Sequence, residues 1–237
     1  MIPIVDTHQH LWNLNVLRPP WLDDVPALAS DYVMDTYAEV CRGFEVSRTV
    51  YMEVDAAVDQ IETERDYVFG LCDADDNPMA GATLRGRPGT EGFADWVNSL
   101  AEDSRAKGFR QIIHTPDLAP DYCLQDAFIA DVRLLGDLEK HFDICIRPAD
   151  LGSAVKLAQR CPDTRLVLDH CGNAHPEIVN GRLSPDAYDR SDGYWHDPDQ
   201  WKRDMEALGR QENVVCKISG VIARFPEGKD ATECLAD

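Results

Sequence analysis

Basic residues are scarce in this chain. Lys and Arg number 23 against 43 Asp and Glu, which gives a formal net charge of -20 over 237 residues and a pI near 4.6. A nucleic-acid partner is therefore not expected, because binding phosphates requires a basic footprint. The same charge disfavours an anionic membrane surface, and the sequence has no apolar run long enough to span a bilayer.

Several other signatures are missing. None of the eight cysteines lies in a C-x-x-C pair, so neither a zinc knuckle nor a redox motif is expected, and the thiols are predicted to be reduced. No nucleophile elbow, Walker loop or G-x-G-x-x-G fingerprint follows a strand, which argues against phosphoryl and hydride transfer. The start, Met-Ile-Pro-Ile-Val-Asp, lacks a positive flank and a long apolar region, so a cytoplasmic protein without a signal peptide is expected.

Short apolar runs alternate with stretches of helical periodicity. Helices are predicted near residues 60–69, 91–107, 126–138, 153–159 and 197–208, with Asp126 and Asp197 as N-caps. Alternation of apolar strands with helices indicates a parallel sheet covered by helices, and a spacing of about 35 residues per unit is typical of a barrel. The predicted buried strands are residues 4–7, 49–54, 79–84, 109–114, 142–146, 165–169 and 214–219.

We therefore expect one α/β domain over residues 1–237, a TIM-type (β/α)8 barrel whose eighth strand is missing from the sequence. Either the barrel is open or the natural protein extends beyond Asp237. An unpaired edge between strands one and seven is a pairing liability, so a homo-oligomer that covers the gap is one solution. The long polar stretch from Asn173 to His196 is predicted to be a loop on the catalytic face.

The strongest chemical signal is Asp-Thr-His-Gln-His at the end of the first strand. His8 and His10 are two residues apart, so both point to the barrel mouth while Thr7 and Gln9 turn away. Such a pair can ligate a metal ion or polarise a carbonyl as two hydrogen-bond donors. Two packed core histidines are the alternative, and the position at a strand end favours the functional interpretation.

The sixth strand ends in Asp169-His170. Adjacent strand residues face opposite ways, so only one of the two enters the mouth easily. We expect His170 there, with Asp169 in a supporting or structural role. Polar residues also end the other apolar strands, which is typical of a barrel site, and each is as compatible with a structural ion pair as with a substrate contact: they are Glu53, Arg85, Arg110, His114, Arg147, Lys217 and Ser219.

Four segments together, D-T-H-Q-H-L-W, G-F-R-Q-I-I-H, L-D-H-C-G and N-V-V-C-K-I-S-G, resemble the amidohydrolase-related (amidohydrolase 2) branch of the amidohydrolase superfamily. The likeness spans nearly the whole chain and is greatest to sugar lactonases, such as L-fuconolactonase and L-rhamnono-lactonase, and to 2-pyrone-4,6-dicarboxylate lactonase. It implies a (β/α)8 barrel, hydrolysis of a cyclic ester, His8, His10 and His170 around the carbonyl, and Arg110 near the substrate.

Two departures from the family pattern bear on the mechanism. Many metal-dependent relatives have a His after strand five, where this chain has Arg147, so the resemblance leaves open a Zn ion held by His8, His10 and His170 or no metal at all. Relatives also carry a catalytic Asp after strand eight, and no residue here replaces it. Glu53, a carboxylate at the end of strand two, is a conceivable substitute base.

The sequence thus predicts a lactone hydrolase with a small-molecule substrate. A neutral sugar lactone needs partners for its hydroxyls, whereas a dicarboxylate needs several arginines; we favour the sugar or sugar-acid lactone. A metal-dependent decarboxylase and a non-catalytic fragment or binding module are the alternatives. The predicted substrate contacts are Trp12, Glu53, Arg110, His114, Arg147 and Lys217.

Overall fold

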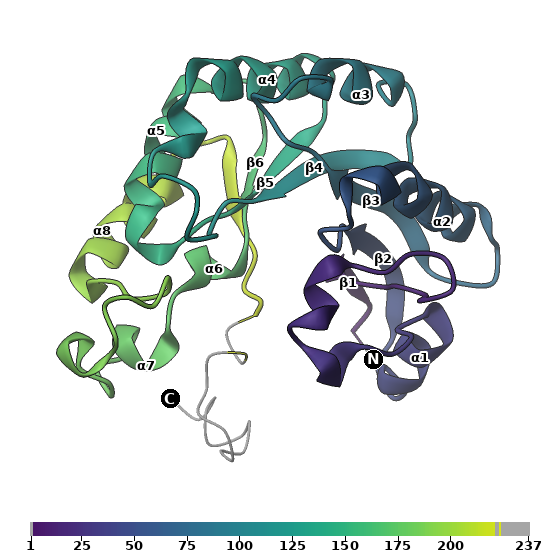
Figure 1. The fold of residues 1–237 in the computed structure, drawn as a ribbon, viewed down its shortest axis with the longest axis horizontal. Coiled ribbons are helices and arrows are strands. Elements are labelled where there is room, and N and C mark those ends of the chain that lie inside the picture. The colour runs from purple at the N-terminus through teal and green to yellow at the C-terminus, as the bar shows by residue number, and fades with distance from the viewer. Residues whose placement is uncertain (1, 221–222, 224–237) are drawn as a thin grey trace. The chain divides into compact units, whose positions relative to one another are not determined.

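The computed structural model describes residues 2–220 and residue 223. Within them, seven strands follow one another in the sheet in sequence order (Figure 1). The pairings β1–β2, β2–β3, β3–β4, β5–β6 and β6–β7 are parallel. This is the predicted α/β, TIM-barrel-like arrangement. The strands are β1 Ile4–Gln9, β2 Val46–Met52, β3 Met79–Arg85, β4 Ala106–Ile112, β5 His141–Cys145, β6 Leu166–Leu168 and β7 Val214–Cys216.

Helices connect successive strands, as expected for parallel neighbours. The sequence also predicts a helix after the seventh strand; it lies outside the described residues, as does Cys234, the last of the eight cysteines. In the described part the helices are α1 Met34–Val40, α2 Ile61–Asp73, α3 Phe93–Ser99, α4 Asp126–Asp137, α5 Leu151–Arg160, α6 His170–Asn173, α7 Pro176–Val179 and α8 Pro198–Gly209.

The chain divides into two compact units. The first comprises Met1–Arg87 and Trp96–Arg110, and the second comprises Pro88–Asp95 and Gln111–Asp237. In the first unit, α2 packs against β3, and Tyr51, Met52 and Val68 are fully buried. Burying a side chain of this size contributes about 1.5–3 kcal/mol relative to leaving it exposed, so the end of β2 is embedded in the core of this unit.

The second unit has its own core. Strands β5 and β6 contribute Phe142, Ile144, Leu166 and Leu168, all fully buried, while α5 and α8 pack against each other (Figure 1). On α4, the predicted apolar face is buried, with Ile129, Val132 and Leu135 exposing at most 2% of their surface. Periodicity therefore identified the buried face of this helix correctly.

Local expectations were wrong at two places. The helix predicted over 91–107 ends at Ser99, because Ala106 is buried and pairs with Ala82 as the first residue of β4. Asp126 does not cap α4; its carboxylate forms an exposed ion pair with Arg160. Asp197 does cap α8, since its side chain accepts a hydrogen bond from the Gln200 N–H over 2.7 Å.

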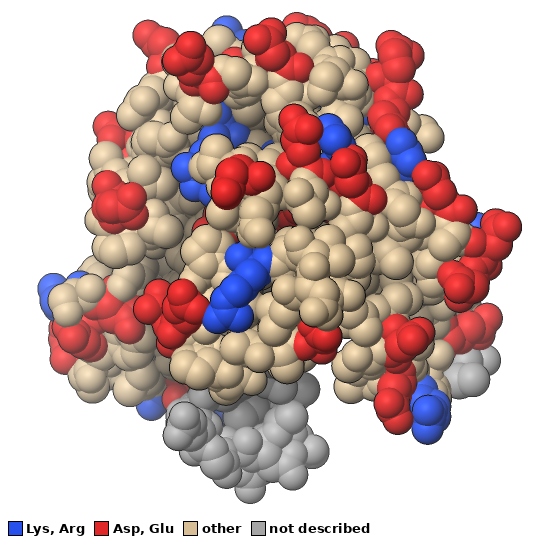
Figure 2. All heavy atoms as spheres, turned by 45° about the vertical axis from the view of Figure 1, so that its right-hand side comes forward, with Lys and Arg blue, Asp and Glu red and all other residues tan. Residues whose placement is uncertain are grey.

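Acidic side chains are scattered over the face drawn in Figure 2, with basic ones interspersed more sparsely. This distribution matches the net charge of -20. Across the described residues, no helix combines the length and the apolar character that crossing a bilayer would demand.

Candidate active site

His8 and His10 are neighbours at the end of β1. Their ring centroids are 4.9 Å apart and the rings meet edge to face. Gln9 lies between them in the sequence and turns toward α1, where its Nε2 donates to the Met34 sulfur over 3.8 Å. The alternation predicted for these residues is therefore confirmed: the two imidazoles share a side and Gln9 leaves it.

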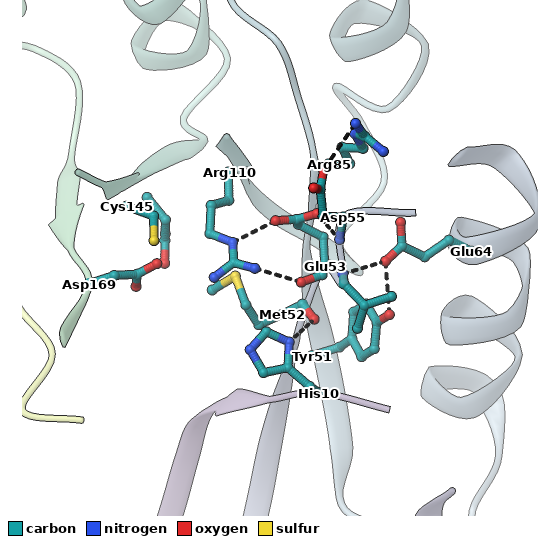
Figure 3. A network of polar contacts seen from close by, with 12 residues as sticks. His10, Tyr51, Met52, Glu53, Asp55, Glu64, Arg85, Arg110, Cys145 and Asp169 are labelled. Atoms are coloured by element: carbon teal, nitrogen blue, oxygen red, sulfur yellow. Dashed lines mark hydrogen bonds and ion pairs between the residues drawn. The ribbon is translucent and has the colours of Figure 1, made fainter. Parts of the chain in front are cut away.

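The environment of His10 selects one tautomer of its neutral ring. Its Nδ1 lies 3.0 Å from the main-chain carbonyl oxygen of Met52 (Figure 3). A carbonyl oxygen can only accept, so we assign the proton to Nδ1, which leaves a lone pair on Nε2. In this form Nε2 suits a metal ligand or a proton acceptor, and it cannot donate to an oxyanion.

Glu53 and Arg110 form a buried ion pair at the ends of β2 and β4. The Arg110 Nε donates to Glu53 Oε1 over 2.6 Å, and Nη2 donates to the Glu53 main-chain oxygen over 2.7 Å. The other carboxylate oxygen of Glu53 accepts the Asp55 N–H over 2.7 Å. Both residues are almost completely buried, so each charge depends on the other for compensation. Both oxygens of Glu53 are already acceptors, which weakens its case as the base.

A second buried carboxylate of the first unit was not predicted from the sequence. Glu64 lies on α2 with 1% of its surface exposed, and its Oε1 accepts the Tyr51 hydroxyl over 2.9 Å and the Val54 N–H over 2.8 Å (Figure 3). Burial, followed by the negative charge of Glu53, raises its pKa to about 7. The available signal was a charged residue four positions before Val68 on the apolar face of a helix.

Arg85, at the end of β3, also pairs within the first unit. Its Nη2 lies 3.0 Å from Asp55 Oδ1, and only 5% of Arg85 is exposed. Asp55 has a left-handed backbone, with φ of 50°, a conformation that costs a non-glycine residue roughly 1–2 kcal/mol. The ion pair offsets part of this cost and ties the segment after β2 to β3.

In the second unit, β6 ends at Leu168, so Asp169 and His170 follow the strand. The premise that they alternate within a strand was wrong: His170 has a left-handed backbone with φ of 53°. Its Nδ1 lies 2.9 Å from the Ser219 hydroxyl oxygen. A hydroxyl can donate or accept, so this contact orients the ring without fixing its tautomer.

Lys217 lies among buried carboxylates. Its Nζ is 2.5 Å from Asp143 Oδ2 and 3.4 Å from Asp169 Oδ1, and both aspartates are fully buried. His141 Nε2 lies 3.2 Å from the other Asp143 oxygen. The ammonium predicted as a substrate contact thus neutralises two interior charges of its own unit.

The remaining predicted contacts have partners of their own. Arg147 donates to the carbonyls of Thr115 and Leu118 and to the Asp150 carboxylate, which connects the loop after β4 to β5. His114 Nδ1 lies 3.2 Å from the hydroxyl of Tyr194 in the long polar loop.

Trp12 is buried, with 6% of its surface exposed. Its indole N–H donates to the Ser30 carbonyl over 2.8 Å, and its ring packs against Trp21 and Tyr32. The one polar group of this side chain is therefore used within the fold of the first unit.

The histidines fit a divalent transition metal. Zn²⁺ takes neutral imidazole nitrogens that carry a lone pair, and a ligating His typically donates its other N–H to a carbonyl or carboxylate. His10 meets this description through its Nδ1 contact with the Met52 oxygen, and the adjacent ring of His8 offers a second imidazole.

The chain resembles proteins of known identity. It is 27% identical to the L-fucono-1,5-lactonase of Burkholderia ambifaria over 223 residues, which cover 92% of this chain and 67% of that enzyme. Two crystal structures of an amidohydrolase from Burkholderia multivorans share the fold. The one with bound HEPES has a TM-score of 0.74 and 21% identity, covering 97% of this chain and 75% of that one. The one with bound Zn has a TM-score of 0.71 and 20% identity, covering 93% of this chain and 70% of that one.

A family model confirms the relationship suggested by the sequence motifs. The model described as Amidohydrolase matches residues 5–237, which is nearly the whole chain and includes His8, His10 and His170. The chain therefore belongs to the amidohydrolase family.

Proposed function

We propose that this hydrolase opens a small lactone of the sugar or sugar-acid class. The observation that carries the proposal is the contact between His10 Nδ1 and the Met52 carbonyl. It commits the neutral ring to present an Nε2 lone pair beside the second imidazole of His8. The likeness to an L-fucono-1,5-lactonase supports the choice of a cyclic ester.

Lactone hydrolysis needs a polarised carbonyl and an attacking water. His8 and His10 of the first unit, together with His170 as proposed from the sequence, would hold a divalent metal. Such a metal supplies Lewis-acid polarisation of the carbonyl when it is bound. The contact of His10 Nδ1 with the Met52 oxygen keeps the ring in one orientation and holds the proton away from Nε2.

Arg110 contributes a fixed positive charge at the end of β4. We assign it to orienting the substrate, because its guanidinium is held in place by two hydrogen bonds to Glu53. Glu53 then acts as a positioning residue for Arg110. Both of its carboxylate oxygens already accept hydrogen bonds, which agrees better with this role than with that of a general base. Preorganised charges of this kind need no rearrangement when charge develops in the transition state.

The arginine contacts favour a sugar lactone over a dicarboxylate. A substrate with two carboxylates needs several guanidinium groups. Arg147 uses its donors on Thr115, Leu118 and Asp150, and Arg85 pairs with Asp55. Two of the candidate arginines are therefore committed to the fold.

The test is a hydrolysis assay on purified protein with L-fucono-1,5-lactone, related five- and six-membered sugar lactones, and 2-pyrone-4,6-dicarboxylate, with acid release followed by pH indicator. We expect sugar lactones to open well above the spontaneous rate. His10→Ala and His170→Ala should each lower kcat/KM at least 100-fold, while Gln9→Ala, whose side chain faces α1, should stay within threefold. Failure of the wild-type protein to accelerate any of these lactones would overturn the proposal.

A further inference from the structure

The end of β2 contacts two side chains of the proposed site. The Met52 carbonyl receives His10 Nδ1, and the side chain and carbonyl of Glu53 receive Arg110. Moving this strand end would displace both His10 and Arg110. What holds it in place therefore decides the geometry of the site.

Glu64 contacts this strand end from α2. Its Oε1 accepts the N–H of Val54, the residue directly after Glu53, over 2.8 Å. At the next peptide unit, Trp21 donates its indole N–H to the Val54 carbonyl over 2.7 Å. Val54 is thus held through both its N–H and its carbonyl by side chains from outside the strand.

Glu64 is also connected to the segment that carries the histidines. The Tyr51 hydroxyl lies 2.9 Å from Glu64 Oε1 and 3.2 Å from the Leu11 carbonyl oxygen. Leu11 directly follows His10, and both Tyr51 and Leu11 are buried. Glu64 Oε1 therefore contacts both the main chain just after β2 and the Tyr51 hydroxyl (Figure 3). That hydroxyl in turn lies beside the main chain that follows His10.

The burial of Glu64 argues that it has a specific role. Glu64 has 1% of its surface exposed, and its Oε1 accepts from the neutral Tyr51 hydroxyl and Val54 N–H. An ionisable side chain in such a place is costly to retain for packing alone. Helix α2 already contributes Val68 and Phe69 to the core, so an apolar residue at position 64 would bury equally well but would leave the Val54 N–H without its acceptor.

We propose that Glu64 is a second positioning residue of this site: from α2 it fixes the main chain at the end of β2, and through it the orientation of His10 and Arg110. Its burial and raised pKa, about 7, mean that both protonation states are present near neutrality. An acceptor oxygen remains in either state, so the charge itself is dispensable for positioning. The inference rests on the proposed function for its catalytic consequence, but its structural part does not.

The distinction between positioning and general stability is tested with three variants. Glu64→Gln keeps an acceptor oxygen in the same place, Glu64→Ala removes it, and Val68→Ala removes packing from the same helix face without touching the contacts of Glu64. Two measurements are made on each: kcat/KM with the best sugar lactone, and the imidazole nitrogen resonances of His10 in ¹⁵N-histidine-labelled protein, which report the Nδ1–H tautomer and its hydrogen bond.

We expect Glu64→Ala to lower kcat/KM at least tenfold and to shift the His10 nitrogen resonances. Glu64→Gln should restore both to near wild type, and Val68→Ala should leave the His10 resonances unchanged in spite of a comparable loss of Tm. Unaltered His10 resonances in Glu64→Ala, or an equal shift in Val68→Ala, would overturn the inference. If the wild type opens no lactone, the proposed function fails while the His10 resonances still decide the role of Glu64.

Discussion

Arg110 contacts Glu53 at two different atoms, the carboxylate Oε1 over 2.6 Å and the main-chain oxygen over 2.7 Å. The side chains expose 4% and 1% of their surface, so water compensates neither charge. The pair joins the end of β2 to the end of β4 and places a guanidinium at a fixed point of the first unit.

Removing the carboxylate of this pair should be strongly destabilising. Glu53→Ala leaves a buried guanidinium without its counter-charge, and we expect a loss of about 3–5 kcal/mol in the free energy of unfolding by urea titration. The control is Asp23→Ala, which breaks an ion pair of the same 2.6 Å length with Arg18 at the surface, where Asp23 is 76% exposed. That change should cost about 1 kcal/mol or less. Equal losses in the two variants would contradict the buried-pair interpretation.

The raised pKa of Glu64 predicts that the free energy of unfolding falls as pH rises through neutrality. Its folded-state pKa of about 7 lies above the ordinary value of 4.5, so the folded protein binds the proton more tightly than the unfolded chain. The contribution of Glu64 is therefore fully favourable below about pH 4.5 and is lost as pH rises through about 7.

Glu64→Gln, which cannot ionise, should accordingly be more stable than wild type at pH 8, by on the order of 3 kcal/mol, and nearly equal to it at pH 4.5. Urea titrations at both pH values measure the difference. A Gln variant that is destabilised equally at both would show that the carboxylate is not buried in the way described.

Much of the fold followed from periodicity. The apolar runs located all seven described strands, and the same alternation placed His8 and His10 on one side of β1 because side-chain direction in a strand depends only on sequence spacing. The helix predicted over 91–107 failed because Ala106 is a weak local signal and its place in β4 is decided by pairing with Ala82.

The site was harder to predict because it depends on long-range contacts. Sequence identified Glu53 and Arg110 separately, but their pairing spans 57 positions and has no local signature. Lys217 and Arg147 were found as polar strand ends, yet only the fold reveals that they compensate Asp143, Asp169 and Asp150. The left-handed conformation of His170 likewise could not be predicted locally, since few non-glycine residues adopt it.

Zn²⁺ binding should depend on His10, and this dependence can be measured without an activity assay. We expect His10→Ala to weaken Zn²⁺ affinity at least 100-fold in competition with a chromogenic chelator, because the neutral Nδ1–H tautomer offers its Nε2 lone pair to the ion. His141→Gln is the matched control: it removes another imidazole, whose Nε2 lies 3.2 Å from Asp143 Oδ1 in the second unit. Equal Zn²⁺ affinity of His10→Ala and wild type would remove His10 from the ligand set.

A substitution at Gly220 can test the placement of the His170 ring. A Cβ added at Gly220 would lie 2.6 Å from His170 Nδ1, the atom that contacts Ser219, and the backbone φ is +67°. Gly181 has a similar φ of +78° but nothing within 4 Å of an added Cβ. Alanine at either position should therefore cost about 1 kcal/mol in backbone strain, whereas only Gly220→Ala should push the His170 ring away from Ser219.

We expect Gly220→Ala to lower kcat/KM for the best sugar lactone at least tenfold and to shift the His170 nitrogen resonances. Gly181→Ala should leave both the activity and these resonances near wild type. The two variants differ in the steric contact with His170 and share the strained backbone, so the comparison isolates the position of this imidazole. Full activity in Gly220→Ala together with displaced His170 resonances would show that the reaction does not need this ring where the structure places it.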